Sequence, residues 1–230
     1  MEILDVKADL IKDNDQEAAR IRRSLEKSRT FLVNLMGSPG AGKTTVLTET
    51  IRLLKNRYAI GVMEADVDSD VDARAMEELG VRTIQLHTGG SCHMDARMTG
   101  DGLSAMGCSD LDLVFLENVG NLVCPAEFDV GAALSVMILS VPEGDDKPLK
   151  YPLMFSVSDC LLVNKTDTSE IFDFDMDRCI ANVRMRNTEI PVFPVAAVKG
   201  LGIPEWTEWL TGRIKDWKKT VEEADHGSDD

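Results

Sequence analysis

An apolar run, a glycine-rich loop and a helix-forming segment follow one another near the start of the chain, and this order strongly limits the fold. Phe31–Met36 is followed by Gly37–Thr44, with the sequence GSPGAGKT, and then by Thr45–Ile51. The spacing G-x-x-x-x-G-K-T after a strand is typical of a P-loop, whose glycines let backbone N–H groups turn toward one anion. The helix that follows adds the positive end of its dipole. We therefore predict a nucleoside triphosphate site, with Lys43 on the β- and γ-phosphates and the Thr44 hydroxyl on Mg²⁺.

A second motif bears on the base. The predicted buried strand Asp159–Val163 is followed by Asn164-Lys165-Thr166-Asp167, the N-K-x-D pattern of guanine-specific GTPases. The Asp167 carboxylate can accept two hydrogen bonds from guanine, from N1–H and from the 2-amino group, which adenine lacks in that arrangement. A base without these partners leaves polar groups unpaired, so discrimination can be large. We predict GTP as the nucleotide; a polar strand-to-helix turn is the alternative.

Strand and helix candidates alternate along the chain, which predicts an α/β fold of the P-loop NTPase type. The expected sheet is doubly wound and mostly parallel, with helices on both faces. The predicted strands are Phe31–Met36, Ala59–Glu64, Thr83–Leu86, Leu113–Glu117, Leu134–Val141, Asp159–Asn164 and Pro191–Val195. The predicted helices are Asp13–Lys27, Lys43–Lys55, Val71–Leu79, Met94–Met106, Met176–Arg186 and a last one from Pro204.

These elements divide the chain into three predicted parts. Residues 1–30 are an N-terminal helical segment, residues 31–220 form a GTPase domain with metal-binding loops, and residues 221–230 form a disordered acidic tail.

Charge and composition exclude several classes of partner. A formal net charge of −15 repels phosphate, so we expect no binding to nucleic acid or to an anionic membrane. No run approaches 18 apolar residues, and the N-terminus lacks the pattern of a secretory signal. Five cysteines, an odd number, indicate reduced thiols rather than a disulfide framework. We therefore predict a cytoplasmic protein.

Three possible metal ligands follow the ends of two predicted strands. Cys92 and His93 come after the strand that ends at Leu86, and Cys124 comes after the strand that ends at Glu117. In a doubly wound sheet these strand ends share one edge with the P-loop. Thiolate and imidazole are ligands for Zn²⁺, Ni²⁺ or copper; structural thiols and a free loop histidine are the alternative. The other three cysteines, Cys108, Cys160 and Cys179, are expected to be core or surface thiols.

Three ligands leave a tetrahedral site one short, so either water or a second copy of the chain completes it. Cys124 also follows Glu117–Gly120, which corresponds by position to the switch of GTPases. We hypothesise that nucleotide state and metal geometry are coupled through this segment.

Together these segments resemble the nickel-insertion GTPases of hydrogenase maturation, the HypB family. The matching stretches are Gly37–Thr45, Glu64–Val67, Thr88–Ala96 (TGGSCHMDA), Glu117–Pro125 (ENVGNLVCP), Leu139–Pro152 (LSVPEGDDKPLKYP) and Asn164–Asp167. The resemblance implies a homodimeric GTPase that meets its copy through the nucleotide face and through a Ni or Zn site at Cys92, His93 and Cys124. It also implies delivery of nickel, with an accessory zinc-binding maturation protein, to the large subunit of a [NiFe] hydrogenase.

The same resemblance implies roles around the phosphates. Thr44 would bind Mg²⁺, while Asp66 and Glu117 would hold the ion or its waters; together with Lys43 these are the expected catalytic residues. The acidic loop after Asp66 offers competitors at Asp68, Asp70 and Asp72. Further nucleotide contacts, mainly from the backbone, are expected from Gly37, Ser38, Gly40, Ala41, Gly42, Thr45 and Ala197. No efficient general base or arginine finger stands out, so slow hydrolysis, suited to a switch, is expected.

The chain departs from the family pattern in several places. Met1–Thr30 holds neither cysteine nor histidine, so high-affinity nickel storage is not expected. The late guanine motif aligns with Ala196-Ala197-Val198, which displaces its lysine to Lys199.

Ile171 and Phe172 are candidates for an apolar dimer contact. Lys147 and Lys150 are expected at the dimer surface or near the partner's nucleotide, with solvated lysines as the alternative. Met94 and Met98 are expected to pack in a helix rather than to bind metal.

Other readings stay open. The chain could be a metal-binding or storage module in which the nucleotide is only structural. A urease-type nickel-maturation GTPase would carry Cys-Pro-His, whereas Cys92 and His93 are adjacent. A small-molecule P-loop kinase would not need the N-K-x-D motif.

Overall fold

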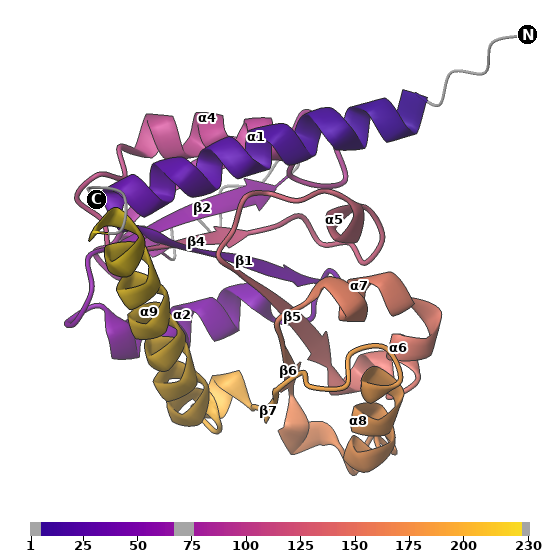
Figure 1. The fold of residues 1–230 in the computed structure, drawn as a ribbon. Coiled ribbons are helices and arrows are strands. Elements are labelled where there is room, and N and C mark those ends of the chain that lie inside the picture. The colour runs from indigo at the N-terminus through magenta and orange to yellow at the C-terminus, as the bar shows by residue number, and fades with distance from the viewer. Residues whose placement is uncertain (1–5, 67–75, 227–230) are drawn as a thin grey trace, which may run out of the picture.

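A single parallel sheet organises the molecule (Figure 1). The computed structural model describes residues 6–66 and 76–226. Seven strands lie in the order β3-β2-β4-β1-β5-β6-β7, and every neighbouring pair is parallel. Their bounds are β1 Phe31–Gly37, β2 Ile60–Asp66, β3 Arg82–His87, β4 Leu113–Glu117, β5 Leu134–Ser140, β6 Cys160–Asn164 and β7 Val192–Pro194. The predicted doubly wound α/β fold is confirmed, and the sheet is wholly rather than mostly parallel.

Two of the helices, α4 and α8, begin directly after a capping aspartate. Asp95 accepts a hydrogen bond from Met98 N at 2.8 Å at the start of α4, and Asp175 accepts one from Arg178 N at 3.0 Å at the start of α8. The helices are α1 Val6–Ser28, α2 Lys43–Leu54, α4 Ala96–Met106, α5 Cys124–Glu127, α6 Lys147–Lys150, α7 Pro152–Val157, α8 Met176–Arg184 and α9 Ile203–His226. Most of the predicted helix Val71–Leu79 lies outside the described residues.

Helices cover both faces of the sheet. On one face, α2 and α9 pack against alternate strand residues such as Phe31, Phe115 and Leu162. On the other face, α1 and α4 lie side by side over one half of the sheet, and α7 and α8 cover the other half. Burial on both faces explains why strands such as β6 are apolar along almost their whole length.

Packed helices form both ends of the described part of the chain. Helix α1 buries Ala18, Ile21 and Leu25 against α4 and the sheet, so the N-terminal segment belongs to the core. Helix α9 continues to His226, so the first part of the segment predicted as a disordered tail is helical. Val221 is buried there, and burial of an apolar side chain stabilises the last turns.

None of the helices within the described residues is both long and apolar enough to span a bilayer.

Candidate functional site

The loop between β1 and α2 has the backbone of a phosphate cradle. Gly40 and Gly42 have φ of +77° and +93°, a left-handed conformation that glycine adopts readily. A Cβ at Gly42 would lie 2.4 Å from Asn164 Nδ2, so a larger residue would also collide with the neighbouring loop. Ala41 N donates to the Ser38 carbonyl at 3.2 Å and closes the turn. Helix α2 begins at Lys43, which directs its N-terminus at the space above the loop.

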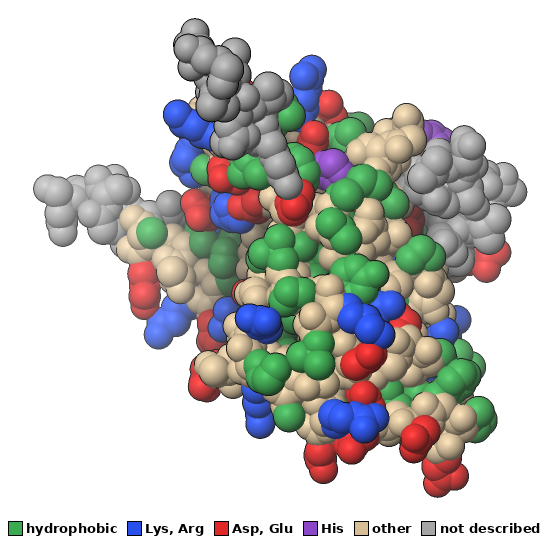
Figure 2. All heavy atoms as spheres, turned by 90° about the vertical axis from the view of Figure 1, so that its right-hand side faces the viewer, with side chains coloured by type: hydrophobic (Ala, Val, Ile, Leu, Met, Phe, Trp, Pro, Cys, Tyr) green, Lys and Arg blue, Asp and Glu red, His purple; other side chains and the backbone are tan. Residues whose placement is uncertain are grey.

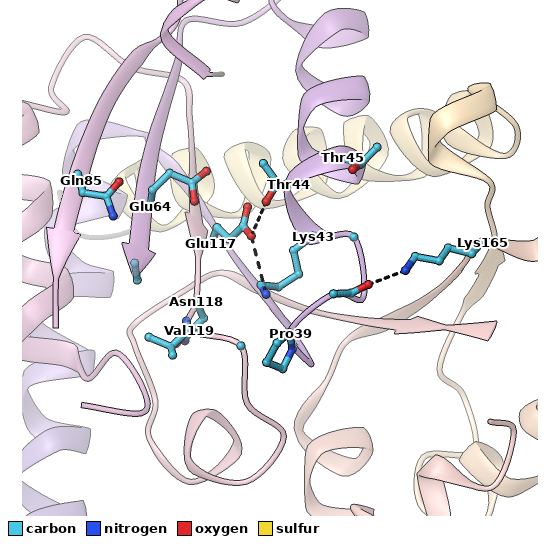
Figure 3. Close-up of a pocket in the computed structure, with 14 residues that line it drawn as sticks. Pro39, Lys43, Thr44, Thr45, Glu64, Gln85, Glu117, Asn118, Val119 and Lys165 are labelled. Atoms are coloured by element: carbon cyan, nitrogen blue, oxygen red, sulfur yellow. Dashed lines mark hydrogen bonds and ion pairs between the residues drawn. The ribbon is translucent and has the colours of Figure 1, made fainter. Parts of the chain in front are cut away.

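A cavity of about 630 Å³ opens above this loop, between the carboxyl ends of β2, β3 and β4 (Figure 3). Lys43 and Glu117 are both buried in its wall, and Lys43 Nζ lies 3.8 Å from Glu117 Oε1. The Thr44 hydroxyl donates to the same Oε1 at 3.0 Å. A hydroxyl beside a carboxylate is the hard oxygen chemistry that Mg²⁺ prefers, so these residues fit the predicted ion. The side chain of Asp66, and all of Asp68, Asp70 and Asp72, lie outside the described part of the chain.

The N-K-x-D segment is hydrogen-bonded to the backbone of the P-loop. The buried Asn164 donates through Nδ2 to Ala41 O at 3.0 Å and accepts from Ala197 N at 3.2 Å. Lys165 Nζ donates to Gly40 O at 2.6 Å (Figure 3). The loops expected to bind phosphate and base are thus bonded to each other.

The displaced lysine of the late motif, Lys199, forms an ion pair with Asp167, the carboxylate predicted to select guanine. Lys199 Nζ lies 2.9 Å from Asp167 Oδ2, and this contact lowers the pKa of Asp167. The carboxylate is therefore ionised at neutral pH, the state in which it accepts two hydrogen bonds from a base.

The three predicted metal ligands come together at the same edge of the sheet. The ligand atoms of Cys92, His93 and Cys124 all lie within 4.8 Å of one another. The two Sγ atoms are 2.8 Å apart, and Cys92 Sγ lies 3.7 Å from His93 Nδ1. All three side chains are at least partly exposed, so a metal ion could reach them. The donor set suits a borderline or soft ion such as Ni²⁺ or Zn²⁺.

The surroundings hold these ligands in defined states. The His93 ring stacks on Phe128 with centroids 4.1 Å apart, and burial lowers the pKa of His93. The imidazole is therefore neutral near pH 7, the form that binds metal. The hydrogen bond that Cys124 shares with Cys92, together with partial burial, raises the pKa of Cys124, so a proton must leave when the thiol becomes a ligand.

Two asparagines that the sequence analysis did not single out connect the nucleotide cavity to the metal loop, the segment from Cys92 to Met94. Asn118 lines that cavity, and its Oδ1 accepts from Met94 N at 3.1 Å while its Nδ2 donates to Asn34 Oδ1 at 3.1 Å. Asn121 Nδ2 donates to Cys92 O at 3.3 Å, and the Asn121 backbone forms a bridge with Gly37. Their place directly after Glu117, between a strand end and Cys124, was the available sequence signal.

The remaining singled-out residues have ordinary surroundings. Met94 is buried and Met98 packs against the same cluster, as expected for helix packing. Lys147 lies over the Tyr151 ring, and Lys150 pairs with Asp146. Ile171 and Phe172 are exposed. The three cysteines outside the cluster have free thiols: Cys108 is half-buried, and Cys160 and Cys179 are buried.

The chain resembles proteins of known family along most of its length. The family model described as "CobW/HypB/UreG, nucleotide-binding domain" matches residues 31–194. The hydrogenase maturation factor HypB of Azotobacter vinelandii is 47% identical over 208 residues, which are 90% of this chain and 69% of that protein.

Two crystal structures share the fold at a TM-score of 0.83. HypB from Helicobacter pylori, in complex with nickel, is 34% identical and is matched over 89% of this chain and 96% of its own. Hydrogenase maturation factor HypB from Archaeoglobus fulgidus is 35% identical, with 88% and 99% covered.

Proposed function

The chain belongs to the HypB family of hydrogenase maturation factors, within the CobW/HypB/UreG group of nucleotide-binding domains, and on that premise we propose that it is a GTP-driven nickel chaperone. It would bind Ni²⁺ at Cys92, His93 and Cys124 and use GTP hydrolysis to time the release of the ion. The observation that carries the proposal is a pair of hydrogen bonds to the segment that contains Cys92 and His93: Asn118 accepts from Met94 N, and Asn121 donates to Cys92 O.

In this proposal the P-loop binds the triphosphate and the N-K-x-D segment selects guanine. Lys43 stabilises negative charge on the β- and γ-phosphates, and backbone N–H groups from Gly37 to Thr45 hold their oxygens. Thr44 and Glu117, with Asp66, would hold Mg²⁺, which neutralises phosphate charge when bound. Their support is the 3.0 Å contact between the Thr44 hydroxyl and the Glu117 carboxylate. Hydrolysis would be slow, because no described side chain has the placement of a strong general base.

The metal is the cargo of the protein. Two sulfur ligands and one imidazole are one short of a tetrahedral set, so we propose that a second copy of the chain completes the site. An exposed apolar surface supports such an interface. It is formed by Val123, Leu149, Leu153 and Val157, on or directly before α5, α6 and α7. Helix α7 contacts both α5 and α6, and Cys124 begins α5. Figure 2 shows hydrophobic side chains gathered on the side of the molecule where these helices lie.

The nickel in the similar Helicobacter pylori structure supports Ni²⁺ as the cargo, although the donor set would also accept Zn²⁺. The large subunit of a [NiFe] hydrogenase would be the final recipient, and an accessory zinc-binding maturation protein would take part in the transfer. Both partners follow from the family's role in hydrogenase maturation.

The proposal is tested by titrating Ni²⁺ into the purified chain with GDP and with a non-hydrolysable GTP analogue, while light scattering reports the molar mass of the assembly and so separates monomer from dimer. We expect the Ni²⁺ affinity or the mass of the assembly to differ between the two nucleotides. A tenfold change in affinity corresponds to about 1.4 kcal/mol of coupling. Equal affinity and equal mass in both nucleotides would refute the switch and leave a storage module with a structural nucleotide.

A further inference from the structure

The side-chain amide of Gln85 is buried in the wall of the nucleotide cavity, yet among the described residues neither its Oε1 nor its Nε2 has a hydrogen-bond partner. Leaving a buried polar group unsatisfied is costly, because the group has given up its hydrogen bonds to water. Ile84 and Leu86, on either side of Gln85, pack into the apolar cluster on the opposite face of the sheet. An apolar residue at position 85 would therefore avoid the cost, so the amide points to a ligand inside the cavity.

The position of Gln85 in the sheet links it to the phosphate site. Gln85 on β3 is in register with Glu64 on β2, and Glu64 is in register with Glu117 on β4. The three side chains form a row across adjacent strands, which lie about 4.8 Å apart. Figure 3 shows them next to one another in the cavity wall. Glu117 ends the row at the P-loop, where it contacts Lys43 and Thr44.

We infer that Gln85 is a positioning residue for GTP hydrolysis, and that its amide orders the water held between Glu64 and the γ-phosphate; this inference rests on the proposed GTPase function. An amide donates through Nε2 and accepts through Oε1 at once, so it can orient water without taking its proton. GTPases of the Ras type orient the attacking water with a glutamine in the same chemical manner.

The step that Gln85 assists is the attack of water on the γ-phosphate of GTP. The water oxygen forms a bond to the γ-phosphorus as the bond from that phosphorus to the β,γ-bridging oxygen breaks. GDP leaves with the bridging oxygen, and the proton released from water passes to the phosphate oxygens or to solvent. Gln85 remains neutral throughout, which fits slow hydrolysis without a strong base.

The deciding variant is Gln85→Leu, which keeps the size of the side chain and removes its polar atoms. The matched control is Thr83→Val, a polar-to-apolar change on the same strand and the same face. Within the described residues the Thr83 hydroxyl bonds to Val81 O alone, and Thr83 is not among the residues that line the cavity. For both variants, single-turnover GTP hydrolysis, affinity for GDP and for a non-hydrolysable GTP analogue, and thermal unfolding of the nucleotide-free chain are measured.

For Gln85→Leu we expect hydrolysis to slow by at least about tenfold, the order of effect that misplaced reacting groups produce. Nucleotide affinity should stay within about twofold of wild type, and the midpoint of unfolding should be unchanged or higher, because an unsatisfied amide has been removed. Thr83→Val should hydrolyse GTP like wild type.

Wild-type hydrolysis in Gln85→Leu would overturn the inference and leave the proposed function intact. A parallel loss of hydrolysis, nucleotide affinity and stability would also overturn it, because that pattern belongs to a structural residue. A wild-type chain that binds GTP and does not hydrolyse it would refute the proposed function itself, and the inference with it.

Discussion

The side chain of Asn118 is bonded to the backbone of Met94: its Oδ1 accepts a hydrogen bond from Met94 N at 3.1 Å. Met94 directly follows His93, and Asn118 directly follows Glu117, so one buried contact joins the metal loop to the end of the strand that faces the phosphates. A shift of β4 on GTP binding would therefore reach the residue next to His93 through this donor–acceptor pair, alongside the second link from Asn121 Nδ2 to Cys92 O.

Replacing Asn118 by alanine should make the affinity for nickel independent of which nucleotide is bound. The change removes the acceptor for Met94 N and for Val119 N, and it leaves Lys43 and the P-loop in place. We expect the GTP affinity to stay near the wild-type value, while the ratio of nickel affinities in the two nucleotides falls toward one. Calorimetric titration of Ni²⁺ in each nucleotide measures this ratio.

The matched control for that variant is Asn118→Asp, because a carboxylate still accepts from Met94 N and Val119 N. It should retain more of the nucleotide dependence than Asn118→Ala does. Loss of the one acceptor atom that serves both Met94 N and Val119 N also predicts that Asn118→Ala unfolds more easily, by about 1–3 kcal/mol. A coupling ratio that survives in the alanine variant would show that the signal passes elsewhere.

Replacing either Cys92 or Cys124 by serine should weaken metal binding strongly. A hydroxyl is a poor ligand for the ions that thiolates select, and changes even outside the ligand shell can cost 10–100-fold in affinity. We expect a loss beyond about 100-fold, measured by competition with a chromophoric chelator. Cys108→Ser is the control, since that thiol lies away from the cluster, and it should bind metal like wild type. Equal binding by all three variants would exclude this cluster as the metal site.

Asp167→Ala should remove the preference for guanine over adenine. Without the carboxylate, the guanine N1–H and 2-amino groups lose their acceptor, and we expect GTP affinity to fall by at least about 100-fold while the weak affinity for ATP changes little. Lys199→Ala is the control: its ion pair with Asp167 lies at the surface, where solvent weakens such pairs, so GTP affinity should change less than about fivefold. Nucleotide competition against a fluorescent GDP separates the two outcomes.

The strands and the local motifs were readable from the sequence because each is defined by neighbouring residues. Parallel strands buried on both faces produce continuous apolar runs, which is why the predicted range Leu113–Glu117 matches β4 at both ends. The P-loop, N-K-x-D and the Cys92–His93 pair are likewise local patterns, and the fold brings all of them to one edge of the sheet.

Features that depend on contacts between distant segments were not readable. The short helices α5, α6 and α7 each have proline in the first turn and too few residues for periodicity to show. The bond from Asn118 to Met94 spans 24 positions, and nothing in the spacing of either residue indicates its partner. Helix α9 runs on past Val221 because that side chain is buried by the rest of the protein, which the acidic composition of the segment conceals.

The ion pair between Asp145 and Arg178 should make folding stability depend on pH in the acid range. Asp145 is buried and accepts from Arg178 Nε at 2.9 Å, and this bond lowers the pKa of Asp145. The stabilisation is therefore complete above the unfolded-state pKa of about 3.9 and is lost as pH falls through the folded-state pKa.

In urea unfolding at pH 7, Asp145→Asn should be less stable than wild type by about 1–2 kcal/mol, the lower part of the range for charged hydrogen bonds, because Arg178 is half exposed. The gap should stay full down to about pH 4 and then shrink as the pH falls toward the lowered folded-state pKa. The exposed neighbour Asp146→Asn should follow wild type within about 0.5 kcal/mol at every pH. A gap for Asp145→Asn that is constant with pH would contradict the ion-pair explanation.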